Sequence, residues 1–168
     1  MPQMTSPEDL FVHELQDVYY AEQTLTKVLP TLAEEVSDDE LSEAFEHHLE
    51  ETRQQVSNLE QVFKGLGVPA KGEKCPGIDG IKEEHDTFVE ENEPTEDILN
   101  VFVTGAAART EHYEIAAYTG LIRMAESLGE TEAAELLTKN LKQEEEALRT
   151  VESISKRLLK DSAKHKTA

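Results

Sequence analysis

The chain has 168 residues, and its 36 acidic side chains outnumber its 16 basic ones, which gives a formal net charge of −20. A surface this acidic repels nucleic acid and anionic membranes, so we expect neither as a partner. The acidic surplus also suits a cytosol of high salt, as in a halophile. No apolar run approaches a transmembrane length and no signal-peptide pattern is present, which predicts a cytoplasmic protein.

The first predicted helix covers about residues 7–36. It begins at a serine followed by a proline and two acidic residues, which is a typical helix start. Apolar residues then recur every three or four positions, and Glu22 is the only charged member of this apolar stripe. Pro30 lies inside the helix, and we expect it to kink the helix or end it early.

The second predicted helix covers about residues 38–64, because the segment S-D-D-E at 37–40 matches a capping box. His48 and Gln55 fall on or beside its apolar face, and Glu51 lies at the flank of that face. Residues 65–95 hold five of the eight glycines. We interpret this segment as a long crossover that contains one short extra helix. The only cysteine, Cys75, also lies in this crossover.

Two further long helices are predicted at about 96–127 and 131–159, with a tight turn at Gly129 between them and a frayed tail at 160–168. Glu111 and Glu114 lie one turn apart in the third long helix, and Glu144 interrupts the apolar stripe of the fourth. The pattern predicts a single all-α domain over residues 1–168. Two antiparallel helical hairpins joined by a long crossover make a ferritin-like four-helix bundle.

The glutamates within the apolar stripes are predicted to meet inside this bundle. In a tight antiparallel hairpin, residues equally distant from the turn lie at the same height, so Glu22 is level with Glu51. By the same rule, Glu111 and Glu114 are level with Glu144. Carboxylates gathered in a dry seam repel one another and are costly to bury. Two divalent metal ions would cancel that charge and use the oxygen ligands.

Five segments resemble the YciF-like ferritin-like family, a stress-associated group, and the resemblance covers roughly residues 8–158. They are D-V-Y-Y-A-E at 17–22, H-L-E-E-T-R-Q-Q at 48–55, K-C-P-G-I-D-G at 74–80, E-H-Y-E-I-A-A-Y at 111–118 and L-K-Q-E-E at 141–145. The resemblance implies a fold similar to those of rubrerythrins and ferritins, a site for two metal ions (iron or manganese) and a homodimer.

Carried over to this chain, the resemblance implies that five glutamates hold the metals: Glu22, Glu51, Glu111, Glu114 and Glu144. The family's Glu-x-x-His pattern is broken in both helices that should carry it. Gln54 stands at the histidine position of the second helix, and Ala147 stands at that of the fourth. We therefore expect His48 to supply a nitrogen from one turn earlier, and Gln55 to be a weak neutral ligand.

These residues are compatible with two functions. A di-metal protein would handle oxygen or peroxide, with a small oxidant as substrate and an oxidase or peroxidase type of activity. A metal-free or weakly metal-binding structural or interaction protein would keep the bundle as a dimer. Its buried glutamates would be protonated, bound to water, or paired with Arg53 or Arg109.

Overall fold

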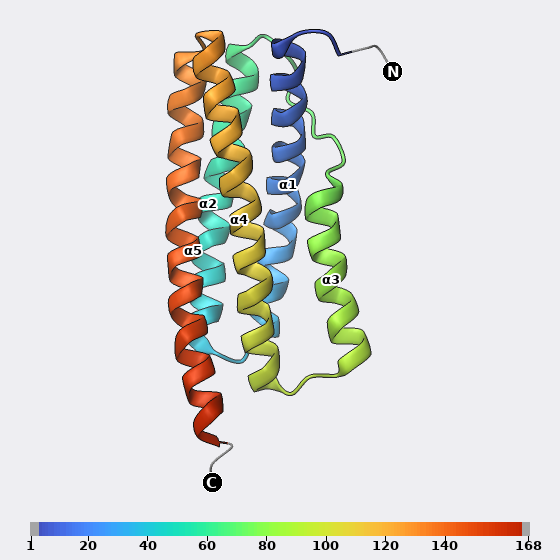
Figure 1. The fold of residues 1–168 in the computed structure, drawn as a ribbon, viewed down its shortest axis with the longest axis vertical. Coiled ribbons are helices and arrows are strands. Elements are labelled where there is room, and N and C mark those ends of the chain that lie inside the picture. Colours follow the sequence, from blue (N-terminus) through green and yellow to red (C-terminus); the bar gives the residue numbers. More distant parts are fainter. Residues whose placement is uncertain (1–3, 166–168) are drawn as a thin grey trace.

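The computed structural model describes residues 4–165, which form five α-helices and no β-strand (Figure 1). The helices are α1 (Pro7–Glu35), α2 (Asp39–Gly65), α3 (Pro76–Asn92), α4 (Glu96–Leu128) and α5 (Thr131–His165). The four long helices run side by side, and α3 lies outside the bundle and packs against α4. The predicted all-α ferritin-like bundle, with its long crossover and short extra helix, is confirmed.

Side chains at the helix starts explain where α1 and α2 begin. Ser6 accepts a hydrogen bond from the Asp9 backbone N–H, and the Asp9 carboxylate accepts one from the Ser6 backbone, which makes a capping box. For α2 the cap is Asp38, one residue later than predicted, and it accepts from the Leu41 backbone N–H. The side chain of Asn100 on α4 binds the backbone N–H and hydroxyl of Ser37 instead, which removes that serine from the cap.

Helix α1 continues past Pro30 to Glu35, close to its predicted end at residue 36, so Pro30 does not end the helix early. Proline removes only one backbone hydrogen bond there, while Leu29 and Ala33 still pack into the core. One predicted helix end is wrong. Helix α5 continues to His165, so the tail predicted at 160–168 is helical as far as the described residues extend. No glycine or proline follows Gly129, and the lysines and alanines beyond residue 159 are good helix formers. Residues 166–168 lie outside the described part.

Helix α3 is fastened to the bundle through Cys75, the residue that caps its N-terminus. The Cys75 sulfur is buried and lies 2.9 Å from the Tyr113 hydroxyl on α4, and that hydroxyl donates to Asp17 on α1 at 3.0 Å. Gly77 lies so close to the Tyr113 ring that a Cβ atom would stand 2.6 Å from it. Burial raises the pKa of the Cys75 thiol, which favours its protonated form at neutral pH.

The bundle core consists of two apolar clusters with a polar layer between them. One cluster is built around the α1–α2 turn and includes Leu29, Phe45 and Ile154. The other lies toward the opposite end and includes Phe11 and Phe63. Between them the bundle buries charged and amide side chains from all four long helices. None of the described helices is long and apolar enough to cross a lipid bilayer.

Candidate metal centre

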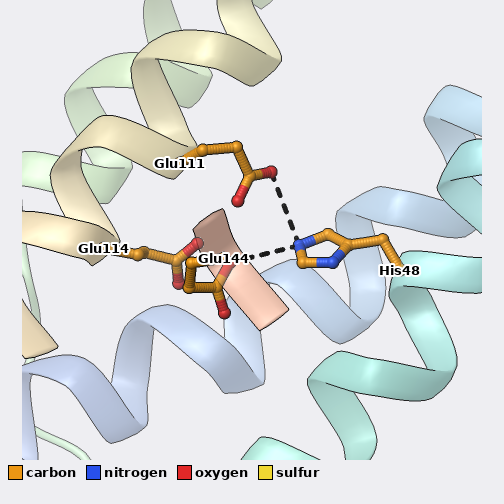
Figure 2. Close-up of side chains that lie close together, drawn as sticks. All are labelled: His48, Glu111, Glu114 and Glu144. Atoms are coloured by element: carbon orange, nitrogen blue, oxygen red, sulfur yellow. Dashed lines mark ion pairs between the residues drawn. The ribbon is translucent and has the colours of Figure 1, made fainter. Parts of the chain in front are cut away.

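Four buried side chains of the polar layer converge on one point (Figure 2). His48 comes from α2, Glu111 and Glu114 come from α4, and Glu144 comes from α5. Each offers one ligand atom, and these four atoms all lie within 4.8 Å of one another. His48 Nε2 lies 3.5 Å from Glu111 Oε1 and 3.6 Å from Glu144 Oε2. Ligand bonds of about 2.1 Å around one ion separate neighbouring donor atoms by about 3.0–3.5 Å.

The helical period explains why these side chains meet. Glu111 and Glu114 are three residues apart, so one turn of α4 directs both toward the bundle axis. Glu144 lies on the buried face of α5 and is fully buried. His48 shares the buried face of α2 with Thr52 and two amide side chains. None of the four converging residues is more than 5% exposed.

Glu22 of α1 lies next to this group and is also fully buried. The Tyr118 hydroxyl on α4 donates a hydrogen bond to Glu22 Oε1. Burial and the charge of Glu144 nevertheless raise the pKa of Glu22 well above its ordinary value. All four long helices therefore contribute an acidic or imidazole side chain to one buried layer. The member from α2 is His48, whereas the heights of the glutamates predicted Glu51.

Glu51 and Gln55 occupy different places from the four converging residues. Glu51 lies at the margin, where its side chain is 18% exposed, and its Oε2 is 3.3 Å from His48 Nδ1. Its other oxygen is 3.6 Å from Nε2 of the exposed His47. Gln55 is buried, and its amide nitrogen donates to Glu144 Oε1. In this arrangement Glu51 orients the His48 ring and Gln55 orients Glu144, while their predicted roles as metal ligands remain predictions.

Burial raises the pKa of every carboxyl group at the centre, and mutual repulsion adds to the effect for Glu111 and Glu114. For Glu144 the rise is opposed by hydrogen bonds from Glu111 and Gln55 and by the charge of His48. Glu114 is the extreme case, because neither of its oxygens makes a hydrogen bond. A group of this kind either takes up a proton or needs a cation.

No arginine or lysine among the described residues forms an ion pair with these buried glutamates. Arg53 pairs with Glu50 and Arg109 pairs with Glu84, so neither of the predicted arginine partners has that role here. Six nitrogen and oxygen atoms of the centre are buried without a hydrogen bond. They are Glu22 Oε2, His48 Nε2, Glu111 Oε2, both oxygens of Glu114 and Glu144 Oε2. Buried polar atoms are nearly always satisfied, so this concentration fits a bound cation.

A chain of hydrogen bonds that the sequence analysis missed supports the centre. Gln54 donates to Asn58 at 3.0 Å, Asn58 donates to Asn140 at 2.7 Å, and Asn140 donates to the Tyr118 hydroxyl at 3.0 Å. Because the tyrosine oxygen accepts from Asn140, its own proton points to Glu22. Polar Asn140 lies four residues before Glu144 on a buried face, and that spacing is the signal that could have identified it.

Comparison with known proteins gives consistent matches over most of the chain. The family model described as a domain of unknown function, DUF892, matches residues 6–164. Protein YciF of Escherichia coli (strain K12) is 40% identical over 142 residues, which cover 84% of this chain and 85% of YciF.

Solved structures show the same similarity in three dimensions. The crystal structure of the E. coli stress protein YciF superimposes with a TM-score of 0.88 at 35% identity and covers 94% of this chain and 99% of that one. YcfI from Rhodopseudomonas palustris, provisionally described as a structural protein, gives a TM-score of 0.86 at 41% identity, over 89% of this chain and 95% of that one.

Proposed function

Since the chain belongs to the DUF892 family and is similar over most of its length to the stress protein YciF, we propose that it is a ferritin-like di-metal carboxylate protein. One observation carries the proposal. Six buried nitrogen and oxygen atoms without hydrogen bonds gather in one layer, and no arginine or lysine of the described residues is paired with the glutamates there. A purely structural core would satisfy these atoms or replace them with apolar groups.

The charge of the layer supports two ions. Glu22, Glu111, Glu114 and Glu144 carry four negative charges when ionised, and two divalent ions would cancel all of them. His48, Glu111, Glu114 and Glu144 would hold one ion, and Glu22 would hold the second together with the carboxylates that neighbour it. A donor set of several carboxylates and one imidazole suits iron or manganese.

Iron or manganese bound there would supply Lewis-acid and redox chemistry toward oxygen or peroxide. The chain itself shields the layer from bulk water at both ends of the bundle, since two apolar clusters enclose it there. It also holds one proton in a defined place, on the Tyr118 hydroxyl that faces Glu22. We include in the proposal a role in stress response with a small oxidant as substrate, a homodimeric assembly and a cytoplasmic location.

The experiment is a metal titration of protein that has been stripped with a chelator and dialysed. Calorimetry with Mn(II), or with Fe(II) without oxygen, should give about two ions per chain. Glu111→Gln should lower the stoichiometry or the affinity, while the exposed Glu145→Gln on α5 should change neither. Absence of heat with both metals, together with an unchanged melting temperature, would refute the proposal.

A metal-free structural protein is the second candidate, and two observations favour it. Ala147 stands where a histidine of α5 would complete the site, and the relative YcfI is provisionally described as a structural protein. In that case the buried carboxyl groups stay protonated at neutral pH, in agreement with the raised pKa values of Glu111 and Glu114. The same titration distinguishes the two candidates.

A further inference from the structure

A cavity of about 190 Å³ opens between α2, α4 and α5 and reaches the candidate metal centre. His48 and Glu111 form part of its wall. Three alanines, one from each helix, leave the space open: Ala44, Ala107 and Ala147. The cavity is much larger than the roughly 30 Å³ that one water molecule occupies in the liquid, so it has room for a molecule of several atoms.

Ala147 is the informative member of this wall. It follows Glu144 by three residues, and residues three apart lie on the same side of a helix. Di-metal bundles place a histidine at this position of the Glu-x-x-His pattern. Here a methyl group takes its place and the space beside it stays open. The space of the missing histidine side chain has therefore stayed open, because neighbouring side chains do not fill it.

Two residues that line this cavity each have a buried polar atom without a partner. His48 Nε2 and Glu111 Oε2 are buried without a hydrogen bond, and both residues line the cavity. The described side chains of α5 offer no nitrogen ligand there, because the wall contributed by α5 consists of Glu146, Ala147, Thr150 and Val151. A metal ion held by His48 and Glu111 would lie beside this cavity, because both residues form part of its wall.

We propose that this cavity binds a small exogenous ligand, which donates one nitrogen or oxygen atom to the metal in place of the absent histidine. The ligand class runs from peroxide-sized anions to a single imidazole ring, and Ala147 sets the upper size. This inference rests on the proposed metal centre. It adds that a molecule from outside the chain completes the coordination of the metal. The substrate would then bind at the position that a histidine occupies in other di-metal bundles.

The test uses Co(II) as a spectroscopic probe in the full-length protein, with azide and imidazole as ligands. Each ligand should change the visible absorption of the Co(II) protein in a saturable manner. Ala147→Leu fills the cavity without a donor atom, so Co(II) affinity should stay the same while azide and imidazole bind at least about tenfold more weakly. Ala147→His supplies the donor internally, so Co(II) should bind at least about tenfold more tightly and imidazole should have no effect.

Glu152→His is the matched control, because residue 152 is exposed on α5 and does not line the cavity. It should leave both the Co(II) affinity and the ligand response as in the wild type. Wild-type protein that binds Co(II) but shows an unchanged spectrum at high azide and imidazole overturns this inference and leaves the metal centre intact. An equal ligand response in Ala147→Leu also overturns it. Failure to bind any metal overturns the proposed function itself.

Discussion

Glu114→Gln is the sharpest perturbation of the buried layer. Glu114 is 1% exposed, neither of its oxygens is hydrogen-bonded, and burial together with the neighbouring carboxylates raises its pKa well above 4.5. A carboxyl group whose pKa is higher in the fold than in the unfolded chain costs stability at neutral pH, because the unfolded chain releases the proton more readily. Glutamine has the same shape and does not ionise, so it removes this cost.

The metal-free variant should therefore be about 1–3 kcal/mol more stable than the metal-free wild type, with a melting temperature higher by about 3–10 °C. With metal the difference should shrink or reverse. Mn(II) at one hundred times its dissociation constant stabilises the wild type by about 2.7 kcal/mol, and Glu114→Gln lacks one ligand for it. Urea and thermal unfolding, followed by far-ultraviolet circular dichroism with chelator and with Mn(II), measure both effects.

The exposed Glu126→Gln on the same helix is the control, and it should behave like the wild type under both conditions. A metal-free Glu114→Gln protein that is less stable than the wild type by more than about 1 kcal/mol would refute the argument from the buried charge. A full Mn(II) stabilisation of this variant would refute the assignment of Glu114 as a ligand.

Three further outcomes are expected. Without metal, the folded state binds more protons than the unfolded state from about pH 4.5 up to the raised pKa values of the buried carboxyl groups. The free energy of unfolding in urea should therefore fall as pH rises through this window. A rise would contradict the directions of the pKa shifts. Tyr118→Phe removes the hydrogen-bond donor to Glu22. It should lower the free energy of unfolding in urea by about 1–3 kcal/mol and weaken Mn(II) binding, measured by calorimetry, about 10–100-fold. Wild-type values for both would show that Tyr118 does not support the site. Gly77→Ala forces a Cβ atom against the Tyr113 ring and should cost about 1–3 kcal/mol, whereas Gly80→Ala, with no atom within 4 Å of its Cβ, should cost nothing; equal values would contradict this packing.

The bundle follows directly from local patterns in the sequence. Apolar residues at spacings of three and four predicted the long helices, because a helix stabilises itself by burying one face. The short turn at Gly129 and the long segment 65–95 then predicted which helices are antiparallel neighbours. The local predictions that differ from the structure concern single residues. Pro30 was outweighed by the core contacts of the residues around it, and Ser37 was taken from its capping role by Asn100, which is 63 residues away.

The candidate centre divides in the same way. Spacing alone places Glu111 and Glu114 on one face and sets them level with Glu144, since the helical period fixes both face and height. The period does not fix contacts at the scale of a hydrogen bond. Whether a side chain reaches the centre depends on the rotation of its helix and on its rotamer, and a shift of an ångström decides that.

For this reason only the packed bundle shows which role each polar side chain of α2 has. His48 lies within the centre, while Glu51 contacts its ring from the margin and Gln55 turns its amide to Glu144. The chain from Asn140 to Tyr118, and the cavity beside Ala147, also depend on three helices meeting at once. Periodicity along one helix predicts on which face of that helix a residue lies and at what height along the bundle. Long-range packing decides which atoms the side chain contacts.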